Sequence, residues 1–302
     1  RASGASSTPS RCSSAGATPC APCSWGVLEF EGSAKAIGYE HMLDEMAEAG
    51  YVGTDLGDWG FMPTQASVLR GALARRGLSL ISAFVPVALG DSSAHAKGIQ
   101  TAIQTAELLA EAGDGACIVL SDDNGTQPER TGHAGRIRSD QGLSLEQWKV
   151  FGAGANQLAR AVKEQTGVDT VFHHHCAGYV ETPAEVEAFL DHTDPQWVGL
   201  CLDTGHYRYG GGDPLAVLKA HASRICLVHF KDCHAKTAEQ ARHNEWDYFA
   251  AVRAGVFCEL GLGDVDFEAI VTELNSQLYD GWIVVEQDVL PALGTPFESA
   301  LR

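Results

Sequence analysis

The chain has 302 residues, of which 45% are hydrophobic and 20% are charged, and its formal net charge is −18. This composition predicts a globular protein with a sizeable core. The length allows one large domain, since parallel α/β barrels commonly have about 250 residues, or two average ones. The acidic balance repels phosphate backbones and argues against a nucleic-acid partner, and no apolar run approaches the roughly 20 residues of a membrane-spanning helix.

Residues 1–23 are rich in Ser, Ala, Gly and Pro, and Arg1 and Arg11 are their only charges. The stretch has no apolar core of the kind found in secretory signals. Its composition predicts a disordered N-terminal tail. We therefore expect one folded domain over residues 24–302.

From Trp25 onward, short apolar runs alternate with longer amphipathic stretches, which is typical of alternating strands and helices. Eight strands are expected, over residues 25–29, 52–56, 80–85, 116–120, 170–175, 197–203, 225–229 and 282–286. Helices are expected between them, for example over residues 39–49, 66–76, 94–112 and 145–164. Ser144 with Gln147, and Thr182 with Glu185, have the capping-box spacing at predicted helix starts.

Eight units of strand followed by helix predict parallel pairing, because each strand returns through a right-handed helical crossover. A closed (β/α)₈ TIM barrel accommodates that count without an exposed edge strand. The alternative is an open doubly wound sheet, but no Gly-x-Gly-x-x-Gly motif follows the first predicted strand. The sequence therefore favours a single TIM barrel.

Nine cysteines are scattered along the chain, and Cys117, Cys201 and Cys226 lie inside apolar strand-like runs. A free thiol in such a run behaves as a small hydrophobic side chain. The odd number and wide scatter predict a reducing compartment, the cytoplasm, rather than a disulfide framework. Cys20 and Cys23 have the Cys-x-x-Cys spacing, but without a second pair this motif is only a weak indication of a zinc or redox site.

Polar side chains cluster where the predicted strands end, and the carboxyl ends of barrel strands converge on one face that carries the active site. Four of them, at the ends of four consecutive strands, combine imidazole and carboxylate groups: His173, Asp203, His229 and Glu286. Such a mixed donor set suits Mn²⁺, Co²⁺ or Zn²⁺ better than Mg²⁺ or Ca²⁺. We therefore predict a divalent-metal site formed by these four residues.

Further strand-end residues are candidates for catalysis or for substrate binding. Strand alternation sends His173 and His175 to the same face, so either can hold the metal while the other handles a proton or a hydroxyl. His175 and His206 are candidates for proton transfer, because imidazole titrates near neutrality; His206 can instead orient Asp203. The remaining candidates are Lys231, which binds a substrate hydroxyl or pairs with Asp232, and Asp55, which binds a hydroxyl or caps the next turn. Asp122 is a further candidate for substrate binding.

Four segments of the chain carry a family resemblance: Val171–Thr182, Leu202–His206, Val228–Asp232 and Gly281–Glu286. Together they resemble the inosose (2-keto-myo-inositol) dehydratase family of the xylose-isomerase-like sugar isomerase/epimerase superfamily. The similarity extends from about Trp25 to the C-terminus. It implies a barrel with one divalent metal. At the ligand positions stand Asp203, His229 and Glu286, with His173 in place of a more usual Glu, and His206 matches a histidine that contacts substrate.

Two positions depart from the dehydratases. Asp55 stands where they carry Glu, and Ser82–Phe84 lacks a Lys that contacts substrate in some of them. The resemblance implies a metal-dependent lyase that dehydrates a keto-polyol such as 2-keto-myo-inositol. The alternative is a metal-dependent isomerase or epimerase of keto-sugars, since both reactions need the same metal and an acid/base group.

Two further functions are alternatives for this chain. An abasic-site endonuclease shares this barrel, but it needs a basic DNA-facing surface, which the net charge of −18 opposes. A sugar-binding barrel without catalysis is a further alternative. The superfamily often forms homo-oligomers, so a homo-oligomer is expected here too. The long stretch Cys233–Gly261 carries Trp246, Tyr248 and Phe249, which we expect either to cover the active site as a lid or to pack as a surface excursion.

Overall fold

The computed structural model describes residues 18–26, 37–287 and 294–302. The main strands are β1 (Gly53–Asp55), β2 (Ser79–Pro86), β3 (Cys117–Ser121), β4 (Asp169–His173), β5 (Val198–Asp203), β6 (Ile225–Phe230) and β9 (Trp282–Val285), and the short pair β7 (Asp232–Cys233) and β8 (Phe257–Cys258) stands apart. The longer helices are α1 (Tyr39–Glu48), α2 (Ala66–Ala74), α3 (Ser92–Ala112), α5 (Leu145–Thr166), α6 (Pro183–His192), α8 (Pro214–His221), α9 (Ala235–His243) and α11 (Phe267–Ser276). The shorter ones are η1 (Pro22–Trp25), α4 (Pro128–Gly132), η2 (Ser139–Gln141), α7 (Thr204–Tyr209), α10 (Tyr248–Arg253) and α12 (Pro296–Ala300).

Seven parallel strands form one sheet in the order β1-β2-β3-β4-β5-β6-β9. Its two outer strands are joined by a short segment around Cys20, which bridges Thr54 of β1 on one side and Val285 of β9 on the other. The Cys20 N–H donates to the Gly53 carbonyl over 3.0 Å, and the Ala21 N–H donates to the Val285 carbonyl over 3.0 Å. The segment therefore occupies the eighth strand position and closes the barrel. This confirms the predicted TIM barrel and leaves no exposed edge strand.

The predicted first strand, residues 25–29, is wrong. Trp25 instead ends the helix η1, and Gly26 follows in the left-handed region with φ 76°; residues 27–29 lie outside the described residues. The strand that closes the barrel lies earlier, around Cys20, within the stretch that we assigned to the disordered tail. That assignment is corrected for residues 18–23, whereas residues 1–17 lie outside the described residues. The segment escaped prediction because it is short and lies between Pro19 and Pro22, without an apolar run.

The other predicted strands and helices match observed elements. The four named helix predictions correspond to α1, α2, α3 and α5, and the seven later strand predictions to β1–β6 and β9. Both predicted capping boxes are present: the Ser144 hydroxyl caps α5 and the Thr182 hydroxyl caps α6. Helix α5 ends at Gly167, whose φ of 76° suits a glycine C-cap. Cys117, Cys201 and Cys226 lie in strands and have free thiols.

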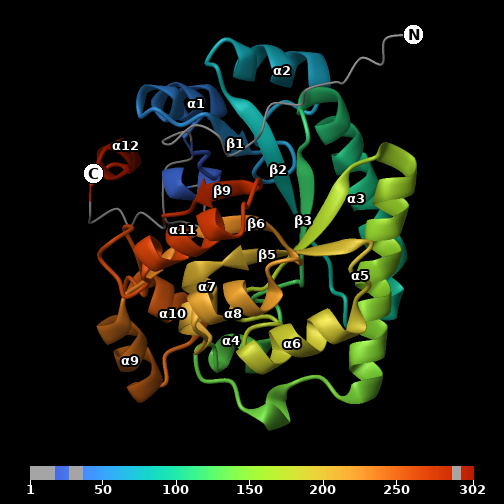
Figure 1. Cartoon of the computed structure of the whole chain (residues 1–302), viewed down its shortest axis with the longest axis vertical. Coiled ribbons are helices and arrows are strands. Elements are labelled where there is room, and N and C mark those ends of the chain that lie inside the picture. The colour runs from blue at the N-terminus through green and yellow to red at the C-terminus, as the bar shows by residue number, and fades with distance from the viewer. Residues whose placement is uncertain (1–17, 27–36, 288–293) are drawn as a thin grey trace.

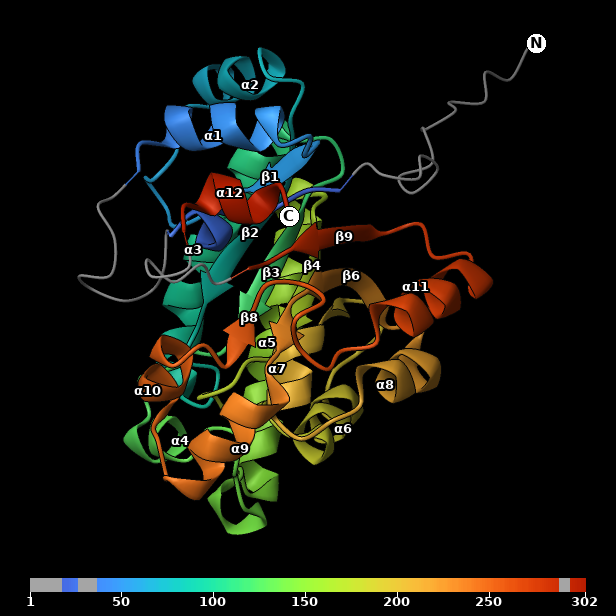
Figure 2. The same ribbon diagram turned by 90° about the vertical axis from the view of Figure 1, so that its left-hand side faces the viewer.

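Helices pack around the outside of the barrel, with α3 and α5 along one flank and α8 beside α11 on another (Figures 1 and 2). Outward-facing strand residues such as Phe172, Leu200 and Val228 join the core between the sheet and these helices. Inward-facing residues form a separate layer in the barrel interior: Ile81, Val119, Val171, Cys201, Leu227 and Val284, together with Ala21. This inner layer fills the interior, so the barrel is a packed core and not a pore.

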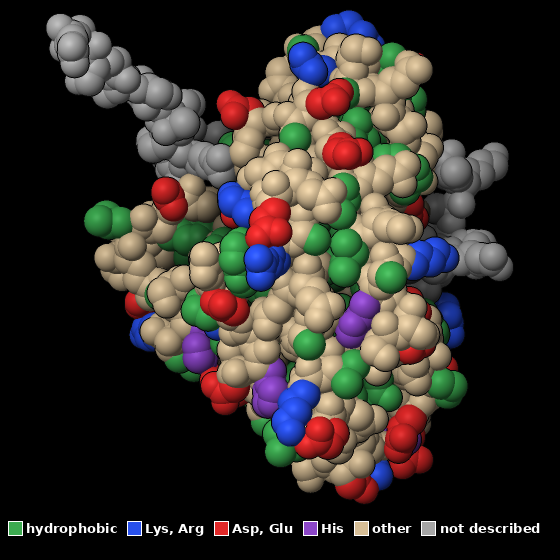
Figure 3. Space-filling view, turned by 90° about the vertical axis from the view of Figure 1, so that its right-hand side faces the viewer, with side chains coloured by type: hydrophobic (Ala, Val, Ile, Leu, Met, Phe, Trp, Pro, Cys, Tyr) green, Lys and Arg blue, Asp and Glu red, His purple; other side chains and the backbone are tan. Residues whose placement is uncertain are grey.

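The surface carries charges of both signs. On the face that Figure 3 shows, Lys and Arg side chains lie apart from one another and among acidic side chains, without an extended basic patch. No helix in the described part of the chain combines the length and the apolar character that crossing a membrane requires.

Candidate metal centre

The four predicted ligands stand at the carboxyl ends of neighbouring strands. His173 and Asp203 are the last residues of β4 and β5, His229 lies near the end of β6, and Glu286 directly follows β9. Each comes two residues after a residue of the inner apolar layer, and residues two apart in a strand share a face. The pairs are Val171 with His173, Cys201 with Asp203, Leu227 with His229, and Val284 with Glu286. The strand period therefore directs all four side chains to the barrel axis.

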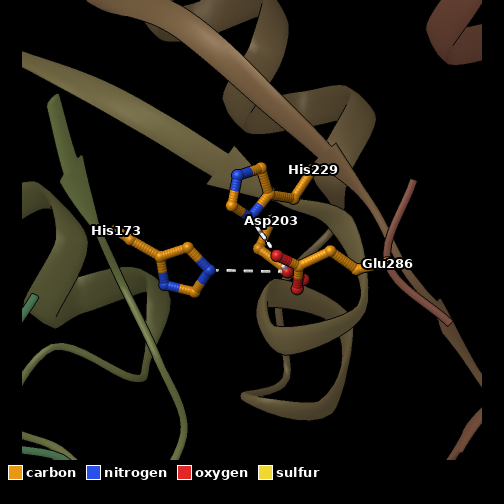
Figure 4. Close-up of side chains that lie close together, drawn as sticks. All are labelled: His173, Asp203, His229 and Glu286. Atoms are coloured by element: carbon orange, nitrogen blue, oxygen red, sulfur yellow. Dashed lines mark ion pairs between the residues drawn. The ribbon is translucent and has the colours of Figure 1, made fainter. Parts of the chain in front are cut away.

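The structure brings these four side chains together (Figure 4). One ligand atom from each of His173, Asp203, His229 and Glu286 lies within 4.8 Å of every other, so that among the described residues these four form a group that could hold a metal ion. His173 Nε2 lies 3.5 Å from Asp203 Oδ2, and His229 Nδ1 lies 3.0 Å from Glu286 Oε1. Side chains from four strands thus converge on one point.

The hydrogen bonds of Asp203 test whether this cluster fits a cation. Asp203 is fully buried, and its Oδ1 accepts the His206 backbone N–H over 2.7 Å, which caps α7. Its Oδ2 is buried and has no hydrogen-bond donor. Buried polar atoms are almost always satisfied, and a buried carboxylate oxygen without a donor is costly. A divalent cation at the centre of the cluster would satisfy that oxygen, so the residues fit a metal.

The pKa values of Glu286 and His229 are shifted by each other and by the nearby Lys231 and Cys201. Burial alone would raise the pKa of the Glu286 carboxyl, but His229 and Lys231 hold it well below its usual value. Burial alone would lower the pKa of His229, but Cys201 and Glu286 raise it well above its usual value. Glu286 is therefore ionised at neutral pH, and an ionised, partly buried carboxylate beside imidazole nitrogens is a suitable environment for a divalent cation.

His175 and His206 lie side by side next to the cluster, and their ring centroids are 3.8 Å apart. Both side chains are buried. Burial, together with the nearby His173, lowers the pKa of His175 to about 3. Burial and the nearby His175 hold the pKa of His206 well below its usual value. Both imidazoles are therefore neutral at pH 7, and each has one nitrogen that donates and one that accepts.

Lys231 is turned toward the candidate ligands and not toward its chain neighbour. Its Nζ lies 3.3 Å from Glu286 Oε2 and 5.1 Å from the centre of the Phe257 ring. The Asp232 carboxylate instead accepts the backbone N–H groups of Gly261 and Gly263, over 2.9 and 2.8 Å. Of the two alternatives predicted for Lys231, the ion pair with Asp232 is therefore replaced by an ion pair with Glu286, and the contact with a substrate hydroxyl stays a prediction.

The two predicted substrate-binding carboxylates have different partners in the structure. Asp55 is buried at the end of β1 and accepts a hydrogen bond from the Ser82 hydroxyl. Its pKa is raised by burial, although the nearby His229 opposes this shift, so Asp55 lies within electrostatic reach of the cluster. Asp122 instead accepts the Tyr179 backbone N–H over 3.1 Å. Together with Gln147 it lines a cavity of about 160 Å³. The predicted role of Asp122 in substrate binding stays a prediction.

The stretch Cys233–Gly261 contacts the histidine pair, and its residues Tyr248 and Phe257 belong to a buried apolar cluster, which fits the packing alternative; its role as a lid stays a prediction. Its helix α10 lies beside both α9 and α4 (Figures 1 and 2). The Tyr248 hydroxyl lies 3.4 Å from His175 Nε2, and Tyr248 is 5% exposed. The Phe257 ring lies 4.6 Å from the His206 ring. Phe257 was not predicted, because the short apolar run Val256–Cys258 has no polar residue that signals a site.

Known proteins resemble this chain over almost its whole length. A family profile described as Xylose isomerase-like TIM barrel matches residues 32–298. The inosose dehydratase of Geobacillus thermodenitrificans is 32% identical over 287 residues, which cover 93% of this chain and 93% of that protein. The inosose dehydratase of Geobacillus kaustophilus is 33% identical over 280 residues, which cover 93% of this chain and 90% of that protein.

Solved structures share the fold at lower sequence identity. The crystal structure of the probable 3-DHS dehydratase AsbF from Bacillus anthracis has a TM-score of 0.70 at 14% identity, and covers 94% of this chain and 97% of that one. The IOLI protein with a bound zinc atom has a TM-score of 0.67 at 15% identity, and covers 94% of each chain. At these identities the likeness concerns the barrel fold alone.

Proposed function

The chain belongs to the xylose isomerase-like TIM barrel family, and from this premise we propose that it is a divalent-metal-dependent lyase that dehydrates a keto-polyol such as 2-keto-myo-inositol. Two independent lines support the proposal. Inosose dehydratases are similar to the chain over 93% of its length. The chain also holds the donor set that such an enzyme needs, assembled at the carboxyl ends of its strands.

The observation that carries the proposal is the convergence of His173, Asp203, His229 and Glu286, with Asp203 Oδ2 left without a donor. These four residues would hold the metal, and two imidazoles with two carboxylates suit Mn²⁺, Co²⁺ or Zn²⁺. When bound, a divalent cation supplies Lewis acidity, which polarises a ketone and stabilises the negative charge that develops as a neighbouring proton leaves.

The residues around the cluster would carry out the proton transfers. His175 is the candidate base for the proton next to the ketone. The nitrogen that would accept this proton is Nε2, on the edge of the ring that faces the Tyr248 hydroxyl. His206 is the candidate acid for the departing β-hydroxyl, so that a C–H bond and a C–O bond break and one water leaves. Lys231, a cation beside Glu286, is placed to bind a substrate hydroxyl, and Asp55 is a second candidate for that contact.

The test is incubation of the Mn²⁺-, Co²⁺- or Zn²⁺-loaded protein with 2-keto-myo-inositol, followed by mass spectrometry of the product. Loss of the mass of one water supports the lyase. A product of unchanged mass, from this substrate or from a ketohexose, overturns the lyase in favour of an isomerase or epimerase. Tight polyol binding without turnover under all three metals overturns an enzymatic function altogether.

Metal analysis of the purified protein tests the site separately from the reaction. We expect His229→Ala to lose the bound metal. His221→Ala is a matched control, because its imidazole lies on α8 and pairs with Glu187, and it should retain the metal. Equal metal content in both variants would contradict the assignment of the ligands.

A further inference from the structure

The turn after β4 places the histidine pair, and one of its residues has an unfavourable backbone conformation. The turn is closed by the His175 N–H, which donates to the Val180 carbonyl over 3.1 Å, and by the Gly178 N–H, which donates to the His175 carbonyl over 3.3 Å. Between them Ala177 has a φ of 68°. This left-handed region is unfavourable for a residue with a Cβ atom, so contacts outside the turn must hold it there.

The backbone of Cys176 contacts both imidazoles of the pair. The Cys176 carbonyl lies 2.6 Å from His175 Nδ1, and the Cys176 N–H lies 3.3 Å from His206 Nδ1. A carbonyl oxygen only accepts and a backbone N–H only donates. His175 therefore carries its proton on Nδ1 and presents a lone pair at Nε2, whereas His206 accepts at Nδ1 and carries its proton on Nε2. One residue thus gives the two rings opposite tautomers.

A buried carboxylate holds the peptide that sets the His175 tautomer. The carbonyl of Cys176 and the N–H of Ala177 belong to the same peptide unit, and that N–H donates to Glu181 Oε2 over 2.9 Å. The other oxygen, Oε1, accepts the Gly135 N–H over 2.6 Å. Glu181 is 1% exposed. Because the two ends of a trans peptide point in opposite directions, the grip of Glu181 on one end aims the other end at His175.

A buried ion pair braces the same turn from its other side. Arg130 is 1% exposed, and its guanidinium donates two hydrogen bonds of 2.8 Å to Glu185. Its Nε donates to the Gly178 carbonyl over 2.7 Å. Glu185 in turn accepts the Glu181 N–H over 3.1 Å. The Arg130–Glu185 pair therefore anchors the backbone on both sides of the turn, at Gly178 and at Glu181.

We infer that Glu181 is a positioning residue, which holds the Cys176–Ala177 peptide in the one orientation that sets the tautomer of His175. Rotation of this peptide by roughly half a turn would return Ala177 to a negative φ, as the difference between type I and type II turns illustrates. It would also aim the Ala177 N–H at His175 Nδ1 and reverse that tautomer. Without the Glu181 carboxylate, the strain at Ala177 favours this flip.

The test uses ¹⁵N NMR of the ring nitrogens at pH 8, a method that distinguishes protonated from unprotonated nitrogens. Glu181→Met fills similar space without an acceptor, and Glu181→Gln keeps one acceptor oxygen. We expect His175 to lose its single tautomer in the Met variant and to keep it in part in the Gln variant. Asp232→Asn alters a buried carboxylate that holds a different loop, and it should leave both histidine signals unchanged.

A second substitution separates positioning from general loss of stability. Glycine adopts a positive φ without strain, so Ala177→Gly removes the reason for the flip. We expect Ala177→Gly to restore the wild-type tautomers when it is combined with Glu181→Met. Wild-type tautomers in Glu181→Met, or altered tautomers that Ala177→Gly fails to restore, would overturn the inference. If the Met variant does not fold, the Gln variant with and without Ala177→Gly decides by the same outcomes.

The consequence for turnover rests on the proposed function. We expect Glu181→Met to lower kcat by about 10- to 100-fold, the cost of misplaced catalytic groups, while KM changes much less and Mn²⁺ affinity stays the same. Ala177→Gly should recover most of the lost kcat. If the wild type shows no turnover, the proposed function fails while the NMR result still decides the role of Glu181. An unchanged kcat in a variant whose tautomers are altered would contradict this consequence alone.

Discussion

His173, Asp203 and His229 are held by strands of the barrel, whereas His175, His206 and Tyr248 are carried on segments that follow strands. The first group, with Glu286, we call the strand half of the site, and the second the loop half. In the strand half the sheet sets the direction of each side chain. In the loop half direction depends on individual contacts, such as the hydrogen bonds of the Cys176 backbone to both rings. The two halves should therefore respond differently to substitution.

The largest effect is expected in the strand half, from Asp203→Asn. Asparagine caps a helix about as well as aspartate, so α7 should keep its cap and the free energy of unfolding should change by less than about 1 kcal/mol. Loss of the ligand should lower kcat/KM by about 1,000-fold or more, since Lewis-acid stabilisation is worth several kcal/mol. Steady-state kinetics and metal analysis check this.

The control is Asp213→Asn, which changes another capping aspartate, at the start of α8 and outside the cluster. It should retain both metal and activity. If Asp203→Asn instead unfolds the protein, the expectation that this substitution removes the metal ligand and keeps the helix cap is wrong. If Asp203→Asn keeps both its metal and strong activity, Asp203 is not a metal ligand.

The next effect concerns the stability of the loop half. Arg130→Met leaves Glu185 without its guanidinium partner, and breaking a buried ion pair costs about 3 kcal/mol. Urea unfolding should show this loss. The double variant Arg130→Met with Glu185→Met should recover part of it, because no buried charge is then left unpaired. A single variant as stable as the wild type would mean that the network does not support the turn.

The same division explains what the sequence could predict. His173, Asp203, His229 and Glu286 follow inward apolar residues by two positions, so strand alternation sufficed to find them. The closing segment around Cys20 could not be found, because its pairing with β1 and β9 depends on closure of the ring and not on a local apolar pattern. The role of Glu181 was missed for a similar reason, since side-chain direction in a turn follows no period.

A pH-dependent effect is expected from Glu181. Burial raises its pKa to about 7, although the N–H groups of Ala177 and Gly135 and the charge of Arg130 oppose the shift and Glu185 adds to it. Cys176 and Tyr209 are the other titratable groups that interact with it. The folded state then holds a proton that the unfolded chain releases at lower pH. Stability therefore falls as pH rises from about 4.5 to about 7.

Glu181→Gln cannot lose this proton and should flatten that part of the stability curve. The difference in unfolding free energy between wild type and variant should change by about 3 kcal/mol across the window, at 1.36 kcal/mol per pKa unit. Urea unfolding at a series of pH values measures it. The two curves would run parallel if Glu181 titrated normally in the folded protein.

The smallest effect is expected from Tyr248→Phe in the loop half. The phenol lies 3.4 Å from His175 Nε2, a long contact, and its ring packs against the same imidazole with centroids 5.5 Å apart. Phenylalanine keeps the ring and loses only the hydroxyl. Because one neutral hydrogen bond contributes about 0.5–1.5 kcal/mol, kcat should fall by about 2- to 10-fold. Steady-state kinetics of the metal-loaded variant measure this.

Tyr279→Phe is the matched control, because it removes a phenol that donates to the Trp282 carbonyl over 3.0 Å, away from the histidine pair. It should leave kcat unchanged. A loss in Tyr248→Phe as large as that in Asp203→Asn would mean that the hydroxyl takes part in the chemistry directly. The loop half would then supply a reacting group in addition to its shape, and the stretch Cys233–Gly261 would be part of the active site rather than its lid.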